Sequence, residues 1–129
     1  PLCQQFGHIL RGKAKMENGA CTVSMDRQFH VSVQGFQTSQ LGDVELMFQS
    51  IDHNGNALNF GEVAVLQEEV PGFTARLIQQ GLIVGAIHNH WIFTVPEILY
   101  VHFQSLEPPL SFAKKVAYAF MALRSYPHG

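Results

Sequence analysis

Three histidines lie in a short and otherwise apolar part of the chain. His88 and His90 are separated by one residue, and His102 follows in the next apolar run. Residues two apart on an extended strand project from the same face, so the first two imidazoles form a ready pair of ligands. Three neutral imidazoles, with a carboxylate or water in the fourth position, are the usual environment of a catalytic zinc ion. The spacing therefore predicts a divalent metal site, with zinc as the expected metal.

The geometry of this site depends on how two extended runs pair. Residues 83–93 and 98–103 are expected to form a hairpin around the segment Thr94-Val95-Pro96-Glu97. An odd-numbered loop would place His102 opposite His90 on the same face, and an even-numbered loop would place it on the other face. A histidine on an apolar strand is also often a core or surface residue whose nitrogens bond to the backbone, and this alternative stays open.

Two glutamates are candidates to complete the site. Glu62 stands among apolar residues of an expected strand, where a carboxylate is seldom buried unless it is paired or ligates something. We predict Glu62 as the fourth ligand or as a group that anchors a ligand, and as the general base if the metal binds water. Glu69 is the second candidate for the base. The alternatives are an exposed strand carboxylate for Glu62 and a partner of the helix dipole for Glu69.

Composition and charge exclude several classes of protein. The chain has 129 residues, of which 47% are hydrophobic and 14% charged, which fits one domain with a single core and excludes a disordered tail. The net charge of −2 and the scattered basic residues argue against a nucleic-acid partner. No apolar run approaches the roughly 20 residues that cross a membrane.

The two cysteines suggest a compartment. Cys3 and Cys21 have neither metal-type nor redox-type spacing, so we interpret both as reduced thiols and leave a disulfide between them open. No basic and then apolar signal segment precedes the domain, which favours a cytoplasmic location.

The expected elements place the candidate residues in one domain. Helices are expected over residues 1–10, from Pro71 to Gly81, and over 110–123. Residues 20–25 and 29–33 are expected to pair through a tight connection, and Asn54-Gly55 predicts a hairpin between the strands 44–51 and 57–66. The apolar run 83–93 is typical of a central strand covered on both faces. We predict a single α+β domain over residues 1–129, with two or three helices on a mainly antiparallel sheet.

Several motifs carry a resemblance to a known family. They are Leu58-Asn59-Phe60-Gly61-Glu62-Val63-Ala64-Val65-Leu66, Glu68-Glu69-Val70-Pro71, Gly81-Leu82-Ile83-Val84-Gly85-Ala86-Ile87-His88-Asn89-His90-Trp91, Pro96, and Tyr100-Val101-His102-Phe103. With them, most of the chain resembles the LppY/LpqO-type bacterial domain of unknown function. That family often has Asp where this chain has Glu62, and it brings no established reaction. The histidine spacing also resembles that of acetolactate decarboxylase, which would imply a carbonyl-activating lyase.

Two functions are therefore expected as alternatives. The first is a zinc-binding domain with His88, His90, His102 and Glu62 as ligands, which acts as a metal-dependent hydrolase or lyase on a small molecule. The second is a non-catalytic domain in which the histidines are structural. In that case the apolar sheet face binds a ligand or a second copy of the chain, so a homo-oligomer is among the expected states.

Overall fold

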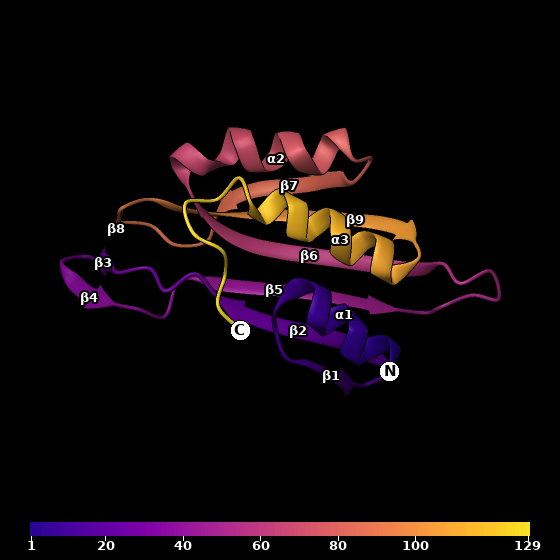
Figure 1. Cartoon of the computed structure of the whole chain (residues 1–129). Helices are drawn as coiled ribbons and strands as arrows, with labels where there is room; N and C mark the ends of the chain where they lie inside the picture. Colours follow the sequence, from indigo (N-terminus) through magenta and orange to yellow (C-terminus); the bar gives the residue numbers. More distant parts are fainter.

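The computed structural model describes all residues from Pro1 to Gly129 and has two sheets and three α-helices (Figure 1). The larger sheet has six antiparallel strands in the order β1-β2-β5-β6-β9-β7, and the smaller has the order β4-β3-β8. The α+β prediction is confirmed. The helices are α1 (Leu2–Leu10), α2 (Val70–Gln79) and α3 (Pro109–Phe120), with a 3-10 turn at Gln67–Glu69. The strands are β1 (Ala14–Glu17), β2 (Ala20–Asp26), β3 (Val31–Val33), β4 (Phe36–Thr38), β5 (Asp43–Gln49), β6 (Ala57–Leu66), β7 (Ile83–Asn89), β8 (Thr94–Val95) and β9 (Ile98–Glu107).

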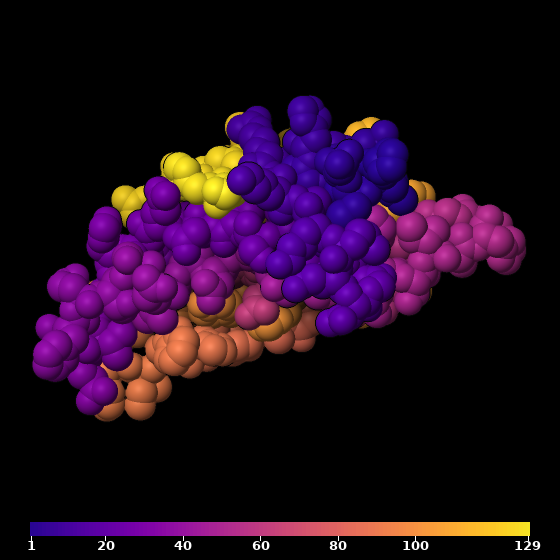
Figure 2. All heavy atoms as spheres, turned by 90° about the horizontal axis from the view of Figure 1, so that it is seen from below, coloured from indigo at the N-terminus to yellow at the C-terminus, as the bar shows by residue number.

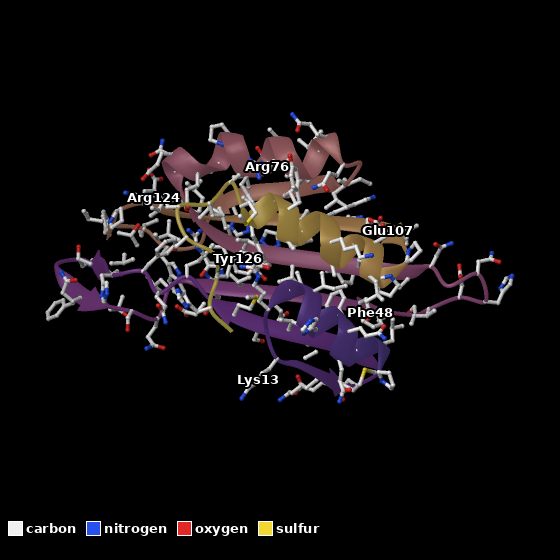
Figure 3. The ribbon with its side chains drawn as sticks, in the orientation of Figure 1. Lys13, Phe48, Arg76, Glu107, Arg124 and Tyr126 are labelled. Atoms are coloured by element: carbon white, nitrogen blue, oxygen red, sulfur yellow. A yellow bond between two sulfur atoms is a disulfide. The ribbon has the colours of Figure 1, made fainter.

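The main core lies between the large sheet and the helices. Phe6 of α1 packs edge-on against Phe48 of β5, with ring centroids 4.9 Å apart (Figure 3). Phe73 of α2 stacks on Phe120 of α3, and Phe103 of β9 packs edge-on against Phe73. Such aromatic pairs stabilise a core beyond the area that they bury. The core therefore fixes one face of β6 and β9 against the helices and leaves their alternate residues on the opposite face.

That opposite face is covered only at one end. There a second core cluster joins the small sheet to the ends of β6 and β9, and its members are Val31, Leu41, Ala64, Leu66, Ile98 and Tyr100. In Figure 2 the purple β3–β4 segment and the orange segment before β9 form this end of the molecule, while the β5–β6 loop projects at the other end. The rest of the face away from the helices is open.

The predicted pairing of residues 20–25 with 29–33 is wrong. Strand β2 pairs with β1 and β5, whereas β3 pairs with β4 and β8 in the small sheet. Between them the buried Arg27 reaches Glu69 on a distant segment, and Gln28 has a φ of 57°, so the chain turns out of the large sheet. The prediction missed β1, which has few apolar residues, and β4, which has only three residues.

The apolar sequence of β7 predicted a central strand, and this prediction is also wrong. Strand β7 pairs only with β9 and forms the outer edge of the six-stranded sheet. Six of its seven residues are exposed, and only Val84 is half-buried. An apolar run cannot by itself distinguish a covered strand from an edge strand, because the pattern does not show how many neighbours the strand has.

The predictions from local sequence signals agree with the structure better than the predictions of strand pairing do. The Asn54-Gly55 hairpin between β5 and β6 is confirmed, and Gly81 ends the α2 segment with a φ of 85°. The two cysteines, however, are not free thiols: Cys3 and Cys21 form a disulfide that joins α1 to β2. Disulfides are typical of oxidising compartments, so this bond counts against the expected cytoplasmic location. None of the helices has the length and hydropathy needed to cross a membrane.

Candidate functional site

The β7–β9 hairpin sets the positions of the histidines. His88 lies opposite Tyr100 and Ala86 lies opposite His102. His88 and His102 therefore project from the same face, as in the odd-loop alternative, but His102 is not opposite His90. This face is the one away from the helices, because Val101 and Phe103 on alternate positions of β9 belong to the main core.

His88 and His102 make direct contact through their ring nitrogens. The two Nε2 atoms are 2.9 Å apart, and the ring centroids are 4.8 Å apart. The Nδ1 atom of His88 lies 3.0 Å from the carbonyl oxygen of Asn89. A carbonyl only accepts, so Nδ1 carries the proton and Nε2 of the neutral ring carries a lone pair. His102 therefore carries a proton on Nε2 and donates it in the hydrogen bond to His88 Nε2.

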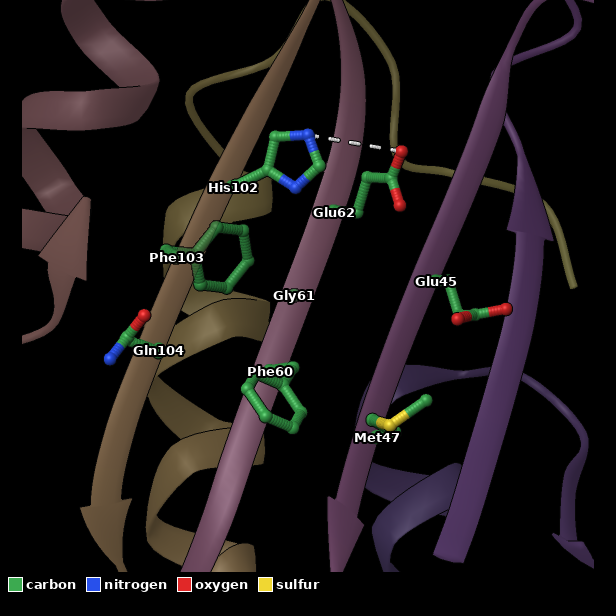
Figure 4. Close-up of a pocket in the computed structure, with 8 residues that line it drawn as sticks. All are labelled: Glu45, Met47, Phe60, Gly61, Glu62, His102, Phe103 and Gln104. Atoms are coloured by element: carbon green, nitrogen blue, oxygen red, sulfur yellow. Dashed lines mark ion pairs between the residues drawn. The ribbon is translucent and has the colours of Figure 1, made fainter. Parts of the chain in front are cut away.

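Glu62 is the carboxylate nearest to this pair. It lies opposite His102 on β6, and its Oε1 is 4.0 Å from His102 Nε2 (Figure 4). The two side chains are 40% and 36% exposed, so water screens their interaction. Three of the four predicted metal-binding residues thus lie together on adjacent strands.

His90 stands apart from the other two histidines. It follows the last residue of β7, and its ring centroid is 6.1 Å from that of His88. Its ring packs edge-on against Trp91 and lies 5.0 Å from Tyr100. No group of three or more His, Cys, Asp or Glu side chains adopts the arrangement of a formed metal centre. Rotation of the His90 side chain would be needed to bring a third nitrogen to the pair.

Glu69 occupies a different environment from the one that a base requires. Its two oxygens accept hydrogen bonds of 3.0 and 2.7 Å from the buried guanidinium of Arg27, and each also accepts one backbone N–H, from Leu66 and from Arg124. Burial by itself raises the pKa of Glu69, but these donors outweigh it and lower the pKa below the usual value. None of its partners is a histidine. The structure gives Glu69 an ion-pair partner, Arg27, that sequence analysis did not connect with it.

Tyr100 forms the floor beneath the histidines. It is buried, and its ring lies parallel to that of His88 with centroids 6.4 Å apart. Burial raises the pKa of Tyr100, and the nearby carboxylates of Asp43 and Glu62 raise it further. The phenol donates a hydrogen bond of 3.5 Å to the buried carbonyl oxygen of Leu41. The sequence signal for the place of Tyr100 beneath the histidines is the alternation of Tyr100 and His102 on one strand face.

A shallow pocket of about 280 Å³ adjoins His102 and Glu62 (Figure 4). Its polar side is made by Glu45, Glu62, His102 and Gln104, and its apolar side by Met47 and Phe60. Glu45 lies directly opposite Glu62 on β5, and neither carboxylate pairs with a lysine or arginine. Glu45 was not predicted as a site residue, although its position two residues before Met47 on an amphipathic strand places both side chains on one face.

The comparisons with known proteins identify one family. A family model described as Domain of Unknown Function (DUF1259) matches residues 4–122, which include all the residues of this site. No curated protein and no solved structure matches the chain.

Proposed function

We propose, from the premise that the chain belongs to the Domain of Unknown Function (DUF1259) family, that its histidine pair is a binding site for one divalent metal ion. Zinc is the expected metal, because the available donors are imidazole nitrogens and a carboxylate. The finer assignment to the LppY/LpqO-type branch is part of this proposal and rests on the motifs around Glu62, His88 and His102.

The contact between the two Nε2 atoms is the observation that carries the proposal. Two nitrogens that bind one tetrahedral zinc ion at about 2.0–2.1 Å lie about 3.3 Å apart. In the structure they are 2.9 Å apart, so a small separation of the rings, with the His102 proton moved from Nε2 to Nδ1, would accommodate an ion. The hydrogen bond from His88 Nδ1 to a backbone carbonyl is the arrangement that commonly orients a metal-bound imidazole.

Two further groups are available as ligands. Glu62 approaches from the neighbouring strand, and a change of its side-chain torsions would bring a carboxylate oxygen toward the pair. His90 lies at the end of β7, where the chain leaves the sheet, so a new rotamer there does not disturb the main core. We propose His88, His102 and Glu62 as the primary ligands and His90 as the group that joins them when metal binds.

The open face of the sheet leaves room for chemistry at such a site. A metal ion here would supply Lewis acidity and a bound water of lowered pKa. If Glu62 binds the ion through one carboxylate oxygen, its second oxygen is free to accept a proton from that water. A small molecule would lie over the pocket between Phe60 and His102. This is the arrangement expected of a metal-dependent hydrolase or lyase that acts on a small molecule.

One observation favours the alternative function. The two histidines already satisfy each other by a hydrogen bond, as structural histidines do. In that case the chain is a non-catalytic domain that binds a ligand or a partner. Metal content separates the two functions, because only the first requires an ion.

The test is elemental analysis of untagged protein that has been incubated with zinc and then gel-filtered. The wild type should retain about one equivalent, and a His88→Ala/His102→Ala variant should retain less than about a tenth. His53→Ala is the matched control, because His53 lies in the exposed β5–β6 turn and should leave the zinc content unchanged. A Glu62→Gln variant should lower the affinity at least tenfold. Equal zinc in the wild type and the double variant, or none in either, would refute the metal site.

A further inference from the structure

The outer edge of β7 lacks the features that usually protect an edge strand. An edge exposes unpaired N–H and C=O groups, and proteins normally blunt it with charged residues, proline or irregular structure. The sequence of β7 is Ile-Val-Gly-Ala-Ile-His-Asn, which contains no Asp, Glu, Lys, Arg or Pro. A shift in register occurs between Val84 and Ala86, but the following residues to Asn89 pair regularly with β9. The stretch 86–89 therefore offers a regular strand edge, although the carbonyl of Asn89 already accepts a hydrogen bond from His88 Nδ1.

The opposite edge of the same sheet differs. Strand β1 carries Lys15 and Glu17, which form an exposed ion pair of 3.4 Å. Charged side chains of this kind discourage pairing with another strand. The two edges of the sheet therefore differ. A head-to-tail assembly, in which β1 of one molecule pairs with β7 of the next, would place these charges against an apolar strand.

Exposed apolar side chains lie on β7 and on the segment that leads from it through β8. Six large ones lie between residues 83 and 95, with exposed fractions of 40% to 70%. They are Ile83, Ile87, Trp91, Ile92, Phe93 and Val95. At roughly 150–250 Å² for a large side chain, they leave roughly 600 Å² of apolar surface on one molecule. A standard interface buries about 800 Å² of each partner, and the apolar surface together with the strand backbone approaches that area.

We propose that this edge pairs with the β7 edge of a second copy of the chain. Two identical strands related by a twofold axis run antiparallel, so each free N–H meets a C=O of the other copy. Strand β7 contains no Asp, Glu, Lys or Arg, so no permanently charged side chains of the two strands oppose each other. The pairing closes on itself and joins the two six-stranded sheets into one continuous sheet. It does not depend on the metal site.

The association is tested by sedimentation of the 129-residue chain between about 1 and 200 μM. The wild type should show twice the 14.4 kDa mass of the single chain at the upper concentrations. Ile87→Lys should raise the dissociation constant at least tenfold, because it places a charge in the paired edge. Met16→Lys is the matched control. It changes an exposed apolar residue on the β1 edge, and it should alter the dissociation constant less than twofold.

A second measurement does not require a variant. Hydrogen exchange of the β7 amides that point away from β9 should slow as the wild-type concentration rises, while exchange of the β1 edge should not change. A single-chain mass at 200 μM would overturn the proposal. So would a dimer that Met16→Lys dissociates and Ile87→Lys does not, because the contact would then lie on the other edge.

Discussion

Replacement of Glu69 by alanine should strongly destabilise the fold. Glu69 accepts two hydrogen bonds from Arg27 and one from each of the backbone N–H groups of Leu66 and Arg124. Without it, a buried guanidinium would keep only the carbonyl of Ala64 as a partner, and two N–H groups would lose their acceptor. Removal of one partner from a buried ion pair typically costs about 3–5 kcal/mol. We expect the free energy of unfolding to fall by that amount.

Urea unfolding followed by circular dichroism measures this loss. With a slope of about 2 kcal/mol per molar urea for a chain of this size, the midpoint should fall by about 2 M. Glu68→Ala is the matched control, because Glu68 is the adjacent residue and has the same charge. It pairs with Arg124 at 3.3 Å on the surface, where both side chains are more than 60% exposed. This variant should cost no more than about 0.5 kcal/mol.

The pH dependence of the same variant gives an independent check. The pKa of Glu69 is lowered in the folded state, so its contribution is fully present above the unfolded pKa of about 4.3. It is lost as the pH falls through the folded value. The difference in stability between wild type and Glu69→Ala should therefore be constant at pH 6–8 and shrink below about pH 4.

Two outcomes would refute this account of Glu69. One is a loss of less than about 1 kcal/mol for Glu69→Ala, because a buried, fully paired carboxylate cannot be removed so cheaply. The other is an Arg27→Met/Glu69→Leu variant no more stable than Glu69→Ala, since removal of both charges should recover about 2 kcal/mol.

Two further predictions concern the disulfide and the glycines. A Cys3→Ala/Cys21→Ala variant should lose about 3 kcal/mol of unfolding free energy in urea, because the bond closes a loop with a sequence separation of 18; an unchanged midpoint would contradict this. Gly61→Ala should lower the thermal midpoint, because a Cβ there would collide with the Phe103 ring, at a cost of about 1–3 kcal/mol. Gly72→Ala, in α2, should raise the thermal midpoint, because a Cβ there would meet only the Ala122 Cβ at 3.9 Å and alanine favours the helix. The reverse order of these two variants would refute the packing.

The parts of the fold that were predictable depend on local chemistry. An Asn-Gly pair between alternating strands determines its turn, and a glycine with positive φ ends a helix wherever the helix packs. The pairing of β2 was not predictable in the same way. Directly after β2, the chain is held by the contact between Arg27 and Glu69, which are 42 residues apart in the sequence. Such a contact leaves no periodic pattern in the sequence.

The candidate site was likewise predictable only where it depends on local spacing. The spacing of His88 and His90 predicted a shared face, but only the observed register shows that His102 meets His88. Glu62 reaches this pair because β6 is the neighbour of β9 in the sheet, and this neighbour relation comes from the α2 crossover to the outer strand. Glu45 lies next to Glu62 because the register between β5 and β6 places these two residues opposite each other. Each of these contacts requires strand order, which alternation within one strand does not encode.

The position of β7 at the edge links the metal site to the proposed dimer and also makes the two separable. His88 points from the open face of the strand, whereas Ile87 lies opposite the core residue Val101 and points to the helix side. Ile87→Lys should therefore dissociate the dimer without a change in zinc content, and His88→Ala should lose zinc without a change in dimer affinity. If both variants lost both properties, the metal would have to lie in the interface itself. The histidines of two copies would then share it, and neither site could be described on a single chain.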